Sequence, residues 1–416
     1  MTQCASSDRH HKPAGRVWLP FTQMGAFDPA ERTFVQAFGT SLIDARGREV
    51  FDAISSVWTT IHGHCHPTIA AAIGRQAKSL DHATALGATN PYAEQLAERL
   101  GELTGLPWAF FSSDGASAIE AALKIALQYW RNVDEPRRTR FVHLTSSYHG
   151  DTVGAMSVSD IAVFRGSFGP LCFETLPYDA LDAALARDDV AAIIVEPIVQ
   201  AAAGMRLVPA ATYEPLRGRR EPLLIVDEIA TGFGRTGTLF AYEQLGLRPD
   251  LLCLGKGLTG GGIALSATLA TDRVFEAFLA DSPLALKHFF HGHSYAANPI
   301  ACAAALASLN VFEREKTLQI VGRTAAHLAA ALEPVRAHPA VREVRQAGLM
   351  CGIELDETQL EERPEALTPG WGIADAMYAR GHFTRPIGAV VQLVPPLTSS
   401  TGEIDDFVEA LLETLA

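Results

Sequence analysis

The chain has 416 residues, of which 48% are hydrophobic and 19% are charged, and its formal net charge at pH 7 is −13. This composition is typical of a folded protein of two domains and excludes a largely disordered chain, while the negative charge argues against a nucleic-acid partner. No apolar run is long enough for a membrane span, residues 1–16 lack a secretory core, and the six scattered cysteines indicate reduced thiols. We therefore expect a cytoplasmic protein that binds neither a membrane nor nucleic acid.

The pattern along the chain predicts a large α/β domain and a smaller α+β domain built from both chain ends. Near the start, residues 41–55 (SLIDARGREVFDAIS) are typical of a hairpin that turns at Arg46 and Gly47. Further on, short apolar runs alternate with helical patterns, which indicates a mostly parallel sheet with crossover helices. The predicted domain limits are 1–61 and 314–416 for the small domain and 62–313 for the large domain.

Strand patterns follow one another through both predicted domains. In chain order, the predicted strands lie at 108–113 (WAFFSS), 140–145 (RFVHLT), 191–197 (AAIIVEP), 223–230 (LLIVDEIA), 251–257 (LLCLGKG), 349–355 (LMCGIEL) and 390–397 (VVQLVPPL). A helix is predicted at 114–130 because Ile119, Leu123, Leu127 and Trp130 recur at helical spacing.

Three of these strands each meet an ionisable residue near the carboxyl end. The residues are Glu196, Asp227 and Lys256, spaced by about 30 residues, the length of a strand–helix–strand unit. Parallel strands connected in this way deliver all three side chains to one edge of the sheet, where open α/β sheets bind ligands. A lysine in so apolar a segment either reaches solvent or serves as an amine with a lowered pKa.

A lysine and a carboxylate at this edge suggest pyridoxal phosphate. Lys256 would bond to the aldehyde carbon as a neutral amine, and Asp227 would pair with the protonated pyridine nitrogen. The helix start after Asp114 offers amides for the phosphate, and Tyr148 offers a ring to cover the pyridine. Each residue alone also has a structural explanation, such as helix capping for Asp114. An aldolase or lyase that uses Lys256 alone is the alternative enzyme class, but it leaves Asp227 without a role.

Residues 223–261 (LLIVDEIATGFGRTGTLFAYEQLGLRPDLLCLGKGLTGG) resemble the signature of the class III (ω-type) aminotransferases, pyridoxal-phosphate enzymes of fold type I. The resemblance extends over nearly the whole chain, and it implies a homodimer whose active sites are shared between subunits. Within the family, WLPFTQM and FTRPIG are most similar to the biotin-biosynthetic branch. That branch implies conversion of 8-amino-7-oxononanoate to 7,8-diaminononanoate, with L-lysine or S-adenosylmethionine as the amino donor. Another class III aminotransferase, acting on a diamine, ornithine or a β-amino acid, stays the alternative.

The resemblance implies roles in cofactor binding. Lys256 would hold the cofactor and move a proton, Asp227 would pair with the ring nitrogen, and Tyr148 would stack on the ring. Ile229 would pack on the opposite face. The phosphate would be held by the amides of Gly115 and Ala116 and, from the other subunit, by Ser294 next to His293.

The resemblance also implies a substrate pocket. Arg385 would hold the substrate carboxylate through its forked guanidinium, and Phe21 and Trp58 would form an apolar wall, with Gly292 close by. Asp151 would either reach a substrate amine or order its loop. Many relatives that use S-adenosylmethionine have a second tryptophan where this chain has Val57, which slightly favours lysine as the donor.

The segment HGHCHP places His62, His64 and His66 close together, but no distant carboxylate or cysteine pair completes a metal site. We therefore expect no metal.

Overall fold

The computed structural model describes residues 16–25, 32–178, 183, 185–359 and 368–416. Its largest sheet has seven strands in the order β4-β12-β11-β10-β7-β5-β6. Their bounds are β4 Trp108–Ser112, β5 Arg140–His143, β6 Leu176–Pro177, β7 Val190–Val195, β10 Leu223–Asp227, β11 Leu251–Leu254 and β12 Ser266–Ala270. β12 is antiparallel to both its neighbours, and the other adjacent pairs are parallel. The mostly parallel sheet expected from the sequence is confirmed.

The strands predicted in the large domain correspond to β4, β5, β7, β10 and β11, and the predicted helix corresponds to α4 (Gly115–Asn132). β12 was not predicted, because its sequence SATLA is short and built of small residues.

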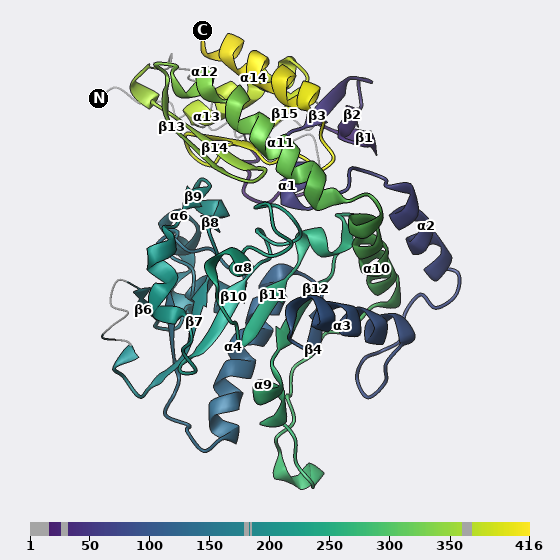
Figure 1. Ribbon diagram of the computed structural model, residues 1–416, viewed down its shortest axis with the longest axis vertical. Coiled ribbons are helices and arrows are strands. Elements are labelled where there is room, and N and C mark those ends of the chain that lie inside the picture. The colour runs from purple at the N-terminus through teal and green to yellow at the C-terminus, as the bar shows by residue number, and fades with distance from the viewer. Residues whose placement is uncertain (1–15, 26–31, 179–182, 184, 360–367) are drawn as a thin grey trace, which may run out of the picture.

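Helices cover both faces of this sheet (Figure 1). Successive strand residues point to opposite faces, so Ile225 of β10 lies in the core that contains α4, whereas Val226 lies in the core that contains α3 (Pro91–Thr104) and α10 (Pro299–Arg314). Burial on both faces explains why these strands are continuous apolar runs rather than alternating ones. The carboxyl edge of the sheet is therefore framed on both sides by packed helices.

The remaining helices are short or lie at the periphery. Their bounds are α1 Ser55–Trp58, α2 Pro67–Gln76, α5 Val153–Ser157, α6 Ala162–Arg165, α8 Tyr242–Leu245, α9 Asp272–Glu276, α11 Thr317–Ala331, α12 Glu333–Arg336, α13 Pro369–Ala379 and α14 Thr401–Leu415. Within the described parts of the chain, no helix has both the length and the apolar character that a membrane crossing requires.

A second group of strands joins segments from the two ends of the chain. The four-stranded sheet β1-β2-β3-β15 and the three-stranded sheet β13-β14-β16 lie beside α11 and α14 (Figure 1). Their bounds are β1 Phe34–Phe38, β2 Ser41–Asp44, β3 Glu49–Asp52, β13 Val341–Ala347, β14 Met350–Leu355, β15 His382–Phe383 and β16 Val390–Leu393. The expected hairpin is confirmed as the antiparallel pair β2–β3. The exact domain limits stay a prediction.

A two-stranded hairpin of β8 (Val199–Gln200) and β9 (Arg206–Leu207) follows β7. This hairpin lies close to β13, so it connects the seven-stranded sheet to the three-stranded sheet.

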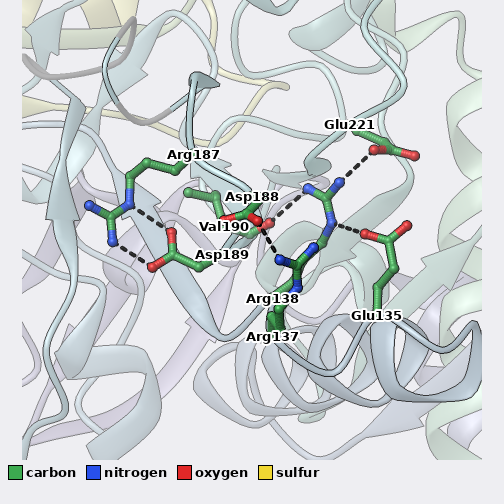
Figure 2. Close-up of polar contacts among 8 residues, drawn as sticks. All are labelled: Glu135, Arg137, Arg138, Arg187, Asp188, Asp189, Val190 and Glu221. Atoms are coloured by element: carbon green, nitrogen blue, oxygen red, sulfur yellow. Dashed lines mark hydrogen bonds and ion pairs between the residues drawn. The ribbon is translucent and has the colours of Figure 1, made fainter.

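Ion pairs tie together the amino-terminal edge of the large sheet (Figure 2). Arg138 donates to Glu135 at 2.6 Å and to Glu221 at 2.7 Å, and its guanidinium also lies 4.2 Å from the centre of the Trp130 ring. Its neighbour Arg137 contacts Asp188 at 2.6 Å, but both of those side chains are 69% exposed. Arg138 therefore connects the end of α4 to the segment before β10, on the edge opposite the candidate site.

We expect Arg138→Ala to lower the free energy of unfolding by about 1–2 kcal/mol, because two ion pairs and a cation–π contact are lost together. Arg137→Ala is the matched control and should change it by less than about 0.5 kcal/mol, since its ion pair is exposed. Urea unfolding followed by circular dichroism measures both values. Equal effects of the two substitutions would contradict this account.

Candidate active site

The three ionisable residues at the strand ends lie around one cavity of about 420 Å³. Glu196 follows β7, Asp227 ends β10 and Lys256 follows β11, and these strands are parallel neighbours. The cavity is also lined by six other residues expected from the sequence, namely Trp58, Gly115, Ala116, Tyr148, Asp151 and Ile229. The sheet topology thus gathers residues from the length of the chain at one edge, as the spacing indicates.

Lys256 is the first residue of a single 3₁₀ turn (Lys256–Thr259) and has a left-handed backbone with φ of 43°. Its ammonium nitrogen lies 4.3 Å from the centre of the Trp58 ring. Burial lowers the pKa of Lys256 from its ordinary 10.5 to about 8, although the nearby carboxylates of Asp227 and Glu196 oppose the shift. A large fraction of the amine is therefore neutral, and nucleophilic, at mildly alkaline pH.

Asp227 is nearly buried, and both carboxylate oxygens accept hydrogen bonds. Oδ2 lies 2.7 Å from Nδ1 of His149, and Oδ1 accepts from the backbone N–H of Ile229 at 3.0 Å. The His149 side chain is wholly buried. These contacts fix the carboxylate where it lines the cavity. His149 was not expected from the sequence, where its position next to Tyr148 in one loop is the available signal.

Helix α4 begins at the cavity and leaves its first amides open to it. Asp114 caps the helix by accepting from the N–H of Ser117 at 2.9 Å, so the amides of Gly115 and Ala116 are not used by the cap. A Cβ atom on Gly115 would come within 2.9 Å of Ile229 Cγ2, so glycine permits this close approach. Free amides at the start of a long helix form a site for a phosphate group.

A second glycine brings the loop of Tyr148 against this helix start. Gly150 has φ of +128°, and a Cβ atom there would lie 2.5 Å from the Cβ of Ala116. Glycine is therefore required both by the backbone conformation and by the close packing. This contact places the Tyr148 ring and the amides of α4 at the same cavity.

Hydrogen bonds hold Tyr148 through both its side-chain hydroxyl and its backbone N–H. Its hydroxyl donates to Oδ2 of Asp151 at 2.8 Å, and its backbone N–H donates to Oε2 of Glu196 at 3.0 Å. Burial and the charge of Asp227 raise the pKa of Glu196 well above its ordinary value. Of the two roles expected for Asp151, the structure shows the contact that orders the loop.

The expected substrate residues extend outward from the cavity. Arg385 and Phe21 do not line it, but the Arg385 guanidinium lies 5.8 Å from the centre of the Phe21 ring. The Phe21 ring packs edge-on against Phe164 at 5.2 Å, and Phe164 packs in the same way against Tyr148 at 5.7 Å. A continuous row of aromatic rings therefore connects the cavity to Arg385.

The Arg385 guanidinium is half-buried and forms no ion pair with a described carboxylate. Burial lowers its pKa. A guanidinium in this setting is available to a carboxylate of a ligand, and it would gain a partner by binding one.

Three expected residues lie elsewhere. Gly292, His293 and Ser294 do not line the cavity of their own chain, and Gly292 and Ser294 are exposed in the loop before α10. The role of Ser294 was expected in the site of another subunit, so a single chain leaves it a prediction.

The clustered histidines face three different partners. His62 lies 3.1 Å from Ser308 Oγ, His64 lies 2.9 Å from Asp52, and His66 lies 3.2 Å from Glu315. Burial lowers the pKa of His62 to about 4, which favours a neutral ring. Over the described ranges, no three histidine, cysteine or acidic residues are arranged to hold a metal ion.

The groups that line this cavity fit pyridoxal phosphate. An amine with a lowered pKa, a carboxylate held by a buried histidine, a free helix start and an aromatic ring all line the same cavity. They match the aldehyde, ring nitrogen, phosphate and ring face of that cofactor in turn.

Because Lys256 has a pKa of about 8, we expect cofactor-free protein to react with pyridoxal phosphate fastest above that pH and slowly below it. The rate should rise with pH because only the neutral amine attacks the aldehyde. Stopped-flow absorbance between pH 6 and pH 10 measures the apparent pKa, and Lys256→Ala should give no covalent adduct. An apparent pKa at the ordinary value near 10.5 would contradict the geometry.

Comparison with known proteins agrees with this chemistry. The family model for class III aminotransferases matches residues 26–415. The chain is 41% identical to the adenosylmethionine-8-amino-7-oxononanoate aminotransferase of Aquifex aeolicus (strain VF5), over 95% of this chain and 94% of that one. It is 34% identical to the protein of the same name from Staphylococcus aureus (strain NCTC 8325 / PS 47), over 95% of each.

Solved structures show the same similarity. The protein named as the same aminotransferase from Methanocaldococcus jannaschii DSM 2661 superposes with a TM-score of 0.89 at 35% identity, covering 96% of each chain. A PLP-bound amine transaminase from an uncultivated Pseudomonas species gives a TM-score of 0.88 at 32% identity, covering 97% of this chain and 99% of that one. The fold is that of the type I pyridoxal-phosphate enzymes, and the chain belongs to the class III aminotransferases.

Proposed function

We propose that this aminotransferase, with pyridoxal phosphate, transfers an amino group to 8-amino-7-oxononanoate and forms 7,8-diaminononanoate in biotin biosynthesis. The observation that carries the proposal is the row of aromatic rings that runs from the cavity of Lys256 to the guanidinium of Arg385. A substrate with a reacting carbon at one end, an apolar chain and a carboxylate at the other end matches this arrangement. The names of the relatives support the same substrate.

When bound, the cofactor supplies an electron sink that stabilises negative charge on the substrate carbon. Lys256 would act as the base that moves a proton between the amino-bearing carbon of the substrate and the C4′ carbon of the cofactor, since its lowered pKa suits proton transfer near neutral pH. Asp227, held by His149, would keep the ring nitrogen protonated. Tyr148 would cover one face of the ring and Ile229 the other.

The remaining residues orient the substrate. Arg385 would hold the carboxylate, while Phe21 and Trp58 would line the path of the apolar chain. Trp58 is nearly buried and lies over Lys256, so it also excludes water from the amine. The cytoplasmic location expected from the sequence stays a prediction.

The amino donor is the finer part of the proposal, and L-lysine is our expected donor. Val57 is 45% exposed next to Trp58, so a small side chain stands where a second broad ring would otherwise meet a sulfonium group. The relatives' names point to S-adenosylmethionine instead. The two donors therefore need a direct comparison.

We expect L-lysine to convert the cofactor of the purified, loaded protein to its amino form, pyridoxamine phosphate, faster than S-adenosylmethionine does. Addition of 8-amino-7-oxononanoate should then restore the original spectrum and yield 7,8-diaminononanoate, which mass spectrometry identifies. Faster conversion by S-adenosylmethionine would correct the donor alone. Failure of both donors with this keto acid, together with turnover of ornithine or a β-amino acid, would overturn the proposed substrate.

We also propose that the protein is a homodimer with shared active sites. The loop that carries Ser294 is exposed and does not line the cavity of its own chain. The neighbouring side chains of Leu284, Phe290 and Tyr295 are 86%, 79% and 65% exposed, which is typical of a surface that a partner covers. In a symmetric pair this loop would bring Ser294 to the phosphate site of the other subunit.

Mixing two inactive variants tests the shared site. Lys256→Ala lacks the amine, and Ser294→Asp places a negative charge against the phosphate, so each homodimer should be nearly inactive. Subunit exchange would create hybrids with one intact site, and about a quarter of wild-type activity should return. No recovery after proven exchange would place both residues in the same subunit's site.

A further inference from the structure

A buried glutamine connects two of the proposed substrate contacts. Gln392 lies in β16 and is 2% exposed. Its side-chain oxygen accepts a hydrogen bond from the indole Nε1–H of Trp58 at 3.0 Å. Its side-chain nitrogen donates to the backbone oxygen of Arg385 at 2.5 Å. One planar amide therefore bridges the aromatic cover of Lys256 and the segment that presents the guanidinium.

The Trp58 end of this bridge cannot hold its position by backbone preference alone. Ser55, Ser56, Val57 and Trp58 form a left-handed turn with φ of 48°, 48°, 64° and 69°. Each non-glycine residue in this conformation is strained, and a β-branched valine especially so. Backbone hydrogen bonds, such as that from the Trp58 N–H to the oxygen of Ile54 at 2.8 Å, and side-chain contacts must therefore maintain the turn together.

Two of those contacts come from the serines. Ser55 Oγ donates to the backbone oxygen of Val394, and Ser56 Oγ donates to Asp52 Oδ2 at 2.9 Å. Neither reaches the Trp58 ring. An indole has a single hydrogen-bond donor, so Gln392 supplies the hydrogen bond that fixes the orientation of the ring above Lys256.

The Arg385 end is fixed by the same strand. The backbone oxygen of Gln392 accepts from the hydroxyl of Thr384 at 2.6 Å, while its side chain holds the carbonyl of the next residue, Arg385. Two successive residues are therefore anchored to one residue of β16. The guanidinium is left free to point toward Phe21.

We propose that Gln392 is a positioning residue that sets the separation between Trp58 and Arg385. Trp58 covers the amine that meets the reacting carbon, and Arg385 would hold the distant carboxylate, so this separation fixes the length of the substrate that fits between them. The inference rests on the proposed function, because it takes Arg385 as the carboxylate contact. Gln392 acts through its two neighbours and touches no reacting atom.

The test compares the binding of nonanoate and of its neutral amide, nonanamide, to the cofactor-loaded protein by calorimetry. Wild type should prefer nonanoate, because only the carboxylate pairs with Arg385. Gln392→Met, which matches glutamine in shape, should lower that preference about tenfold, since the loss of a buried hydrogen bond costs about that factor. Gln76→Met is the matched control, because Gln76 is equally buried in α2 and its side chain donates to the backbone oxygen of Leu80, far from Trp58 and Arg385 in the sequence. The Gln76→Met variant should keep the preference of the wild type.

A double-mutant cycle separates positioning from a general loss of packing. Trp58→Phe keeps a ring but lacks the N–H, so it should lower the same preference, and combining it with Gln392→Met should add little. If Gln392→Met does not fold, as judged by thermal unfolding, Trp58→Phe alone carries the test. An unchanged preference in these variants, full additivity, or a wild type without preference would overturn the inference. Wild type that prefers nonanoate but does not turn over 8-amino-7-oxononanoate would overturn the proposed substrate only.

Discussion

The placement of one amine at the end of a buried strand determines most of what this site can do. β11 is buried on both faces, and Lys256 follows it directly into a tight turn at the cavity. Burial disfavours the charged amine, and the ring of Trp58 leaves it little access to water. An ordinary surface lysine would be almost wholly protonated near neutral pH and could not attack an aldehyde. The surrounding residues act on an amine that the sheet has already made reactive.

The residues that serve this amine come from distant parts of the chain. Trp58 precedes every strand of the seven-stranded sheet in the sequence, whereas Arg385 and Gln392 lie in the last segment of the chain. The amino-terminal and carboxy-terminal strands share a sheet through the parallel pair β3–β15. β3 leads to Trp58 and β15 leads to Arg385. A shift of the four-stranded sheet relative to the seven-stranded sheet would therefore move Trp58 and Arg385 together. The substrate contacts would therefore keep their mutual spacing in such a shift.

Much of the site followed from the sequence because it depends on topology. Asp227 and Lys256 could be placed together because equal spacing of parallel strands implies one edge, and Gly115 followed because a helix begins where β4 ends. His149 and Gln392 could not be found in this way. Their importance arises from single hydrogen bonds between residues 78 and 334 positions apart, and neither periodicity nor spacing encodes such contacts. β12 was missed for another reason, since strands of small residues lack a hydrophobic pattern.

The carboxyl groups of Glu196 and Asp227, which both line the cavity, differ because their surroundings differ. Glu196 and Asp227 end neighbouring parallel strands, so their charges would repel each other at close range in a medium of low dielectric constant. Asp227 receives hydrogen bonds from His149 and from a backbone N–H, whereas the Glu196 side chain is deeply buried and has a raised pKa. The raised pKa of Glu196 favours its uncharged form, which leaves Asp227 as the main source of negative charge at the position of the ring nitrogen. A full charge on Glu196 would raise the pKa of Lys256, because a nearby anion favours the ammonium ion. A raised pKa at Glu196 therefore favours a free amine at Lys256, while the Asp227 carboxylate stays available to a cationic ring in the same cavity.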